Sequence, residues 1–336
     1  MIRLNKNESP YGVFTPEELA KIVSAAELHR YPSTEHDRFL ERYAELEGLG
    51  TEQLGLANGS DEWIQKLHIL IPEGPMLVVE PDFVMYDEYA RQFGRPIVKL
   101  RCEADYELSE AKILEAIQRE KPRLFIFSQP NNPIGTLYSQ AFVDAACDLM
   151  KELGGYCVVD EAYLQYSDPE LRTRVTLDDH VIVLRTFSKI YGMAGLRIGL
   201  AISAPETMAW LKSIDHPYPV NSVSLAIGYA FLADEARQAQ FFQEHHALAA
   251  RLKQILHEEL AGLVPLKASQ ANYVLTYGPR AVSLGRYLTE RGFVLRTYDS
   301  ELLREVVRYS IGTNEEMEQL AVAIRQWKES NDDRTR

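Results

Sequence analysis

Residues 181–199, VIVLRTFSKIYGMAGLRIG, combine an apolar strand with a polar loop that carries one lysine. The strand, Val181 to Leu184, leads to Lys189 between hydroxyls and glycines, and Arg197 follows. Burying an unpaired ammonium group is costly, so a lysine is seldom kept in such a place for packing. A desolvated lysine can instead be held as the neutral amine, which forms a Schiff base with an aldehyde. The plain alternative is a surface lysine on a strand-to-helix loop, and the neighbouring motifs decide between the two.

Two further segments place polar side chains directly after a buried strand. Residues 156–163, YCVVDEAY, contain an apolar strand that ends at Asp160. Residues 123–136, RLFIFSQPNNPIGT, contain another, followed by a loop with two prolines that presents Asn131 and Asn132. Parallel α/β sheets bind ligands at the carboxyl ends of their strands, so these side chains should share a crevice with Lys189.

A predicted helix supplies a fourth part of the crevice. Residues 56–67, LANGSDEWIQKL, resemble a helix start, with Asn58, Ser60 or Asp61 available as the cap. Apolar residues recur at helical spacing from Trp63 onward. The free amides and the partial positive charge of a helix start commonly hold a phosphate group.

Together these parts predict a site for pyridoxal 5'-phosphate (PLP). Lys189 would react with the aldehyde, and Asp160 would keep the pyridine nitrogen protonated so that the ring withdraws electrons. Asn132 and Tyr163 can donate hydrogen bonds to the ring phenolate. The phosphate would contact the amides of Ser60 and Asp61, the hydroxyls of Thr186 and Ser188, and the guanidinium of Arg197.

Short motifs along nearly the whole chain resemble a known family. They resemble the fold-type I aminotransferases of class I/II, and within them the histidinol-phosphate aminotransferase group. The resemblance is more specific for the cofactor than for the substrate. The motifs are LNKNESPYG (4–12), RYP (30–32), ANGSDE (57–62), PNNPIG (130–135), VDEAY (159–163), RTFSKIYG (185–192), GLRIG (195–199) and VRYSIGT (307–313).

The resemblance implies roles that the residues alone do not. Tyr31 resembles the tyrosine that reaches the cofactor phosphate of the neighbouring subunit, so the active unit would be a homodimer. Phe83 stands where the family stacks an aromatic ring on the pyridine. Arg308 and Arg296, together with Asn132, resemble the residues that hold the carboxylate or phosphate of the substrate.

The order of predicted elements indicates the fold class. Strands alternate with amphipathic helices, which favours an α/β fold with a mainly parallel sheet between helices and a smaller α+β domain. The resemblance implies seven strands in that sheet, with the active site between the domains and between two subunits. We predict an amino-terminal segment at residues 1–28 that packs with the small domain, a large PLP-binding domain at 29–240 and a small domain at 241–336. The predicted strands are 76–79, 124–127, 157–159, 181–184, 196–202, 273–276, 294–295 and 306–310, and the predicted helices are 61–70, 110–120, 140–153, 222–233, 234–260, 281–291 and 315–328.

Composition limits the partners and the compartment. The 336 residues are 46% hydrophobic and carry a formal charge of -13, which argues against nucleic acid or an anionic membrane as a partner. Cys102, Cys147 and Cys157 are too scattered for a disulfide framework and suggest a reducing compartment. We find no signal peptide and no apolar run long enough for a membrane span, so we expect a cytoplasmic protein. The eight histidines show no metal-ligand spacing, and no metal site is predicted.

These features predict a PLP-dependent aminotransferase with a two-stage mechanism. Lys189 would act as general base and acid, and the partners would be an amino donor (histidinol phosphate or an aromatic or other amino acid) and a 2-oxo acid such as 2-oxoglutarate. One alternative is a PLP-dependent decarboxylase or lyase of the phosphothreonine-decarboxylase type, which would use the same cofactor residues. Another is a non-catalytic PLP-binding module of a transcription regulator, but we find no DNA-binding segment before Leu4 or after Lys328. A dinucleotide dehydrogenase is disfavoured because the glycines of residues 192–199 lack the Gly-x-Gly-x-x-Gly spacing.

Overall fold

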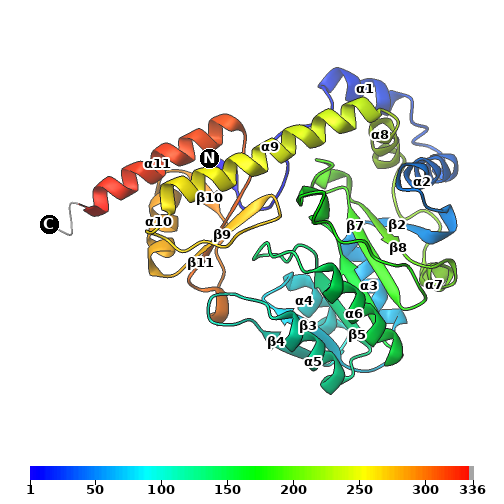
Figure 1. Ribbon diagram of the computed structural model, residues 1–336. Helices are drawn as coiled ribbons and strands as arrows, with labels where there is room; N and C mark the ends of the chain where they lie inside the picture. The colour runs from blue at the N-terminus through cyan, green and yellow to red at the C-terminus, as the bar shows by residue number, and fades with distance from the viewer. Residues whose placement is uncertain (333–336) are drawn as a thin grey trace.

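The computed structural model describes residues 1–332 and places seven strands in one large sheet (Figure 1). Strand β8 is antiparallel to both of its neighbours, whereas all other pairs in this sheet are parallel. The predicted fold, an α/β protein with a mainly parallel seven-stranded sheet, is therefore confirmed. In sheet order the strands are β2 (Leu54–Asn58), β8 (Ile198–Ile202), β7 (Val181–Thr186), β6 (Tyr156–Asp160), β5 (Leu124–Ser128), β3 (Met76–Glu80) and β4 (Ile97–Arg101).

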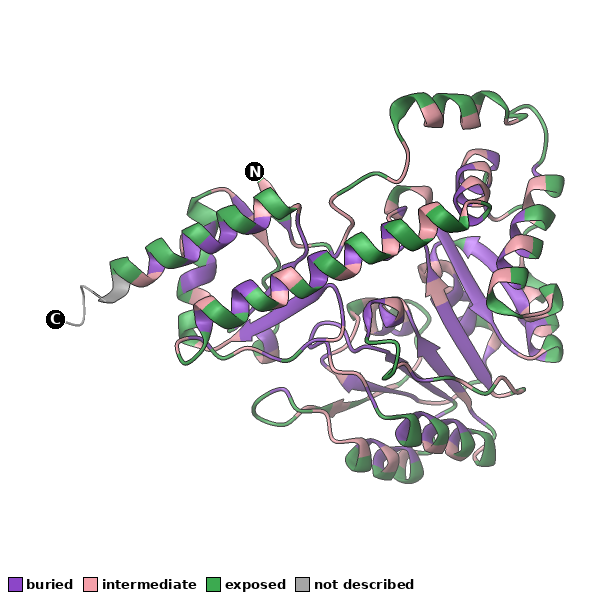
Figure 2. Ribbon diagram, turned by 45° about the horizontal axis from the view of Figure 1, so that its top comes forward, coloured by how far each residue is buried: buried purple, intermediate pink, exposed green. Residues whose placement is uncertain are grey.

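Helices cover both faces of the large sheet because its strands are apolar on both sides. Successive side chains of a strand point to opposite faces. Val78 and Ile126 accordingly pack in the core under α3 (Ser60–Leu70), α4 (Val84–Gln92) and α7 (Pro205–Leu211). Their neighbours Leu77 and Phe125 pack under α5 (Glu110–Glu120) and α6 (Gln140–Glu152). Figure 2 shows the result: the inner strands of the large sheet are mostly buried, the edge strand β4 is not, and most of the covering helices are exposed on their outer faces.

A smaller unit contains two short two-stranded sheets. Strand β1 (Ile2–Leu4) pairs in parallel with β10 (Phe293–Leu295), so the amino terminus is part of this unit. Strand β9 (Tyr273–Tyr277) pairs antiparallel with β11 (Val306–Ser310). The helices of this unit are α10 (Pro279–Glu290) and α11 (Asn314–Asp332).

The long helix α9 (Glu235–Leu260) runs from the helices beside the large sheet to the small unit (Figure 1). The boundary that we placed after residue 240 falls inside this helix, and the last four residues of the predicted small domain lie outside the described part of the chain. At the other end of the molecule, α1 (Pro16–Ser24), α2 (Ser33–Glu47) and α8 (Ser222–Leu232) lie close together. No helix within residues 1–332 has the length and hydropathy needed to cross a bilayer.

Two local predictions at the cavity were wrong. The cap of α3 is Gly59, with φ of 85°, and none of the predicted cap side chains makes the capping bond. Strand β8 begins at Ile198, two residues later than predicted. Leu196 lies in a short 3₁₀ turn and Arg197 has a φ of 55°, so neither residue is extended. Both deviations come from the tight approach of β8 to the start of α3. A Cβ atom on Gly199 would overlap the backbone of Gly59.

Candidate active site

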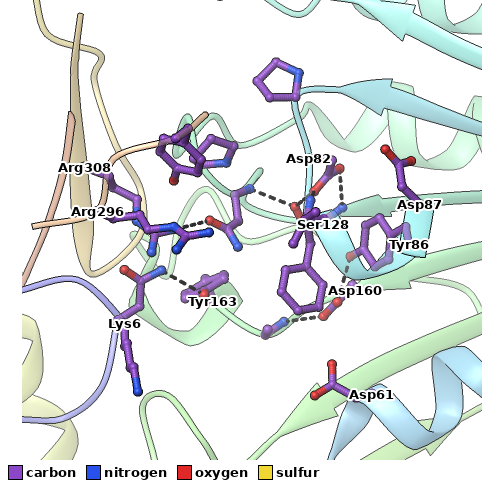
Figure 3. Close-up of a pocket in the computed structure, with 18 of the residues that line it drawn as sticks. Lys6, Asp61, Asp82, Tyr86, Asp87, Ser128, Asp160, Tyr163, Arg296 and Arg308 are labelled. Atoms are coloured by element: carbon purple, nitrogen blue, oxygen red, sulfur yellow. Dashed lines mark hydrogen bonds between the residues drawn. The ribbon is translucent and has the colours of Figure 1, made fainter. Parts of the chain in front are cut away.

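A cavity of about 790 Å³ lies between the carboxyl ends of the parallel strands and the small unit (Figure 3). Strands β3, β5, β6 and β7 all end at its wall, as expected for a ligand site in a parallel sheet. Of the residues expected at the site, Tyr31 and Asn131 are not part of this wall; Asn131 is instead fully buried and bonds to the carbonyl of Pro81. The predicted residues that line the cavity are Ser60, Asp61, Phe83, Asn132, Asp160, Tyr163, Thr186, Ser188, Lys189, Arg197, Arg296 and Arg308.

Lys189 lies on the loop after β7 and is half-buried. Its Nζ donates a hydrogen bond to the backbone carbonyl of Lys6 (3.2 Å) and lies 5.5 Å from the centre of the Tyr163 ring. The amino-terminal segment thus passes directly over the lysine. The Lys6 carbonyl and the Tyr163 ring together therefore orient the amine.

Asp160 stands at the end of β6 with only 4% of its surface exposed. Its Oδ2 accepts a hydrogen bond from the Tyr86 hydroxyl (2.8 Å), and its Oδ1 accepts one from the N–H of Ala162 (3.1 Å). Burial nevertheless raises the pKa of Asp160 to about 6. The pKa of Tyr86 is raised well above its usual value, also by burial, so its hydroxyl remains the donor. A protonated ring nitrogen beside Asp160 would stabilise the ionised carboxylate.

Arg308 bonds both to the loop of Asn132 and to the amino-terminal segment. It is 6% exposed, and one terminal nitrogen donates to Asn132 Oδ1 while the other donates to the carbonyl of Asn5 (3.0 Å). Its Nε is buried and has no hydrogen-bond partner within residues 1–332. Because Arg308 occupies Oδ1 of Asn132, the amide NH₂ of Asn132 is left to donate into the cavity.

Arg296 lies at the same end of the cavity as Arg308 (Figure 3). The two residues form an antiparallel backbone bridge, with N–H to carbonyl distances of 3.1 and 2.9 Å. The Arg296 side chain is exposed, and its guanidinium lies 5.0 Å from the centre of the Tyr298 ring. The cavity therefore has two guanidinium groups at one end, suited to an anionic ligand.

The start of α3 forms an open cradle at another part of the wall. The first amides of a helix have no partner within it, and here no side chain caps them. The Arg197 guanidinium lies against Gly59 and bonds to Asp61 Oδ2 (3.2 Å). Thr186 and Ser188 are buried, and their hydroxyls bond to one another (3.0 Å). Amides, hydroxyls and a guanidinium in one cradle are typical of a phosphate site.

The two predicted aromatic contacts differ in their surroundings. Phe83 is partly buried in the cavity wall and packs edge-on against Tyr86, with ring centres 5.5 Å apart. Tyr31 is 78% exposed and stacks on Tyr218, with ring centres 4.8 Å apart. Tyr31 is thus outside the cavity of its own chain, and its reach into a neighbouring subunit stays a prediction.

Sequence reasoning missed several residues of the cavity wall, among them Asn7, Tyr86, Asp82 and Ser128. Asn7 donates to the Tyr163 hydroxyl (2.9 Å) and bonds to Ser310, which lies 303 residues away in the chain. Tyr86 bonds to Asp160, as described above. No local sequence pattern marks Asn7 or Tyr86. Asp82 and Ser128 bond to one another across two loops. The signal for Asp82 was present, because it follows a buried strand as Asp160 does.

Comparison with known proteins identifies the family. The family model described as aminotransferase class I and II matches residues 1–324. The histidinol-phosphate aminotransferase of Clostridium novyi (strain NT) is 31% identical over 322 residues, which cover 94% of this chain and 88% of that protein. That of Citrifermentans bemidjiense is 33% identical and covers 97% of this chain and 91% of its own length.

A solved structure shows the same fold. Histidinol-phosphate aminotransferase from Sinorhizobium meliloti, in complex with pyridoxal-5'-phosphate, superposes with a TM-score of 0.84 at 24% identity. The superposition covers 97% of this chain and 91% of that one. The family predicted from the sequence motifs is thereby confirmed: the chain belongs to the class I and II aminotransferases.

Proposed function

We propose that this chain binds PLP in the cavity and transfers an amino group from a donor with an anionic group to a 2-oxo acid. The observation that carries the proposal is the shared cavity of Lys189, Asp160 and Arg308. An amine, a buried acid and a buried guanidinium are three chemically different groups that a packed core does not bring together without a ligand. We include histidinol phosphate and aromatic or other amino acids as donors, and 2-oxoglutarate as an acceptor.

The described residues fit PLP. The uncapped start of α3, with Arg197, Thr186 and Ser188, suits its phosphate group. Asp160 is the buried acid that its ring nitrogen needs, and the free NH₂ of Asn132 suits its phenolate oxygen. When bound, PLP supplies an aldehyde that reacts with amines and a ring that accepts electrons from the substrate.

Lys189 would move the proton. Its Nζ would take the proton from the α-carbon of the amino donor and deliver it to the carbon that PLP supplies as its aldehyde. The Lys6 carbonyl and the Tyr163 ring keep the amine on one side of the cavity, where a single group can serve both transfers. The same residue would act in reverse when the 2-oxo acid enters, which gives a two-stage reaction.

Arg308 and Arg296 would bind the anionic group of each substrate in turn. Arg308, which lines the cavity, and the exposed guanidinium of Arg296 could both contact a carboxylate or a phosphate. Donor and acceptor would therefore use one site in alternate halves of the reaction. The bond from Arg308 to Asn132 would link the binding of the substrate anion to the side chain that contacts the cofactor ring.

We also propose that the active unit is a homodimer. Tyr31 is a large, exposed aromatic residue next to Leu28, which is 63% exposed. Exposed apolar surface of this kind is typical of a protein interface. A Tyr31 donated by a second copy would complete the phosphate end of the cavity.

The test is a half-reaction screen of the purified protein loaded with PLP. Histidinol phosphate, phenylalanine and tyrosine would each be mixed with the protein, and conversion of bound cofactor to its amine form would be followed by absorbance. We expect rapid conversion with at least one donor and recovery with 2-oxoglutarate. Lys189→Ala should give no conversion and no borohydride-trapped adduct, whereas Lys21→Ala, a change at an exposed lysine of α1, should behave as wild type.

Two outcomes would contradict the proposal. Carbon dioxide release from an amino acid without need for a 2-oxo acid would assign the decarboxylase or lyase alternative. Normal conversion by Lys189→Ala would remove the lysine from the mechanism.

A further inference from the structure

Asp82 is a second acid in the cavity wall, and the function proposed above gives it no role. It follows β3 and is partly buried, on the same side of the cavity as Asp160 (Figure 3). Burial raises the pKa of its carboxyl group, whereas the hydrogen bonds from Ser128 and Phe83 oppose this rise because they favour the ionised form. An acid in such surroundings is tolerated only where strong hydrogen-bond partners compensate for lost water.

The partners of Asp82 belong to two different loops of the cavity wall. Its Oδ1 accepts the N–H of Phe83 (2.7 Å) and the hydroxyl of Ser128, and its Oδ2 accepts the N–H of Ser128 (3.0 Å). The Ser128 hydroxyl in turn accepts the N–H of Asn132 (2.8 Å). The carboxylate therefore connects the loop of the ring-stacking phenylalanine to the loop of the amide that faces the cofactor.

A carboxylate is the side chain that this position requires. Three donors converge on its two oxygens, and an amide or a hydroxyl would leave at least one of them unpaired. An acid that only closed a turn would bond within its own loop, but two of these bonds reach Ser128, 46 residues away in the chain. Asn131 adds a bond between the same loops, from its Nδ2 to the carbonyl of Pro81 (3.1 Å).

We propose that Asp82 is a positioning residue that holds Phe83 and Asn132 on two sides of the cofactor ring and, through Asn132, orients Arg308. This inference rests on the proposed PLP site. Asn132 is the junction, because its N–H bonds to Ser128 while its side-chain oxygen bonds to Arg308. Loosening the loops would therefore weaken the hold on the cofactor and on the substrate anion together.

The experiment compares Asp82→Asn and Ser128→Ala with the matched control Asp87→Asn. Asp87 also lines the cavity, but its carboxylate pairs with Lys99 on β4. Loss of a bond to a charged group should weaken PLP binding about tenfold in Asp82→Asn, measured by titration of the apoprotein. The KM values for both substrates should rise by a similar factor, with a smaller fall in kcat. Ser128→Ala should likewise weaken PLP binding and raise the KM values.

Amide hydrogen exchange of the apoprotein provides a readout that does not depend on activity. Peptides covering residues 128–136 should exchange faster in Asp82→Asn and Ser128→Ala than in wild type or Asp87→Asn. If both test variants match Asp87→Asn in exchange, PLP affinity and KM, the positioning role is wrong. If Asp82→Asn does not fold, Ser128→Ala decides alone, since it keeps both backbone bonds to Asp82. A wild type that neither binds PLP nor transfers amino groups would refute the proposed function, while the exchange comparison would still test the connection between the loops.

Discussion

Replacing Arg308 by lysine tests the substrate end of the cavity while keeping the charge. Arg308 lines the cavity and uses its two terminal nitrogens to bond to Asn132 and to the Asn5 carbonyl. A lysine has one nitrogen on a flexible stem and cannot keep the bond to Asn132 and also grip an anion in the same geometry. One lost charge-assisted bond to the substrate and one to Asn132 each contribute about 1.5–2 kcal/mol. Their sum, about 3–4 kcal/mol, corresponds to a loss of roughly 150- to 900-fold in kcat/KM.

The assay is single-turnover kinetics of each half-reaction, with an amino donor and then with 2-oxoglutarate. Because one guanidinium would serve both substrates, both values of kcat/KM should fall by similar factors in Arg308→Lys. Arg304→Lys is the matched control, since Arg304 is exposed and lies four residues earlier in the chain. A fall of less than threefold in kcat/KM of both half-reactions would show that the guanidinium of Arg308 does not bind substrate. A large fall in one half alone would show that the two substrates do not share it.

Three more changes test other parts of the site. The pKa of Asp160 in the folded apoprotein, about 6, lies above that of an exposed aspartate, so its stabilising contribution is present at acidic pH and lost as the pH rises through 6. Thermal unfolding between pH 4 and 7 should therefore show a larger loss of stability in wild type than in Asp160→Asn, where other buried acids such as Asp82 still contribute. Gly199→Ala should displace the start of α3 and sharply weaken PLP binding in titrations, whereas Gly195→Ala, where a Cβ meets no atom within 4 Å, should bind normally. Mixing Lys189→Ala with Tyr31→Ala subunits should restore activity above that of either variant, because the mixed dimer would contain one complete site; no gain on mixing would contradict the shared site.

The sequence was informative wherever function follows a buried strand. Lys189, Asp160 and Asn132 could be placed in one crevice because the carboxyl ends of parallel strands meet at one edge. The same rule would have found Asp82. It could not find Asn7, because the place of Asn7 in the cavity wall depends on contacts with Tyr163 and Ser310 that form only in the folded chain.

The wrong cap of α3 has a physical reason that bears on function. A capping side chain bonds to the first amides of its helix and thereby occupies them. At Gly59 the chain instead adopts a positive φ, the Arg197 guanidinium lies against it, and the first amides remain open to the cavity. The edge strand β4 was missed for a different reason: its residues are half-buried or exposed, so their hydropathy gives little periodic signal.

The hydrogen bonds around Asn132 make the cofactor end and the substrate end of the cavity one connected structure. Its backbone N–H is held by Ser128 and therefore by Asp82, and its side-chain oxygen is held by Arg308. A shift at either end moves the amide that faces the cofactor ring. The contributions of these residues are therefore not independent. The free-energy loss in kcat/KM on changing two of them should differ from the sum of the losses of the two single variants. Under the proposed function, such coupling would let the site of Lys189 respond to an anion bound by Arg308 at the other end of the cavity.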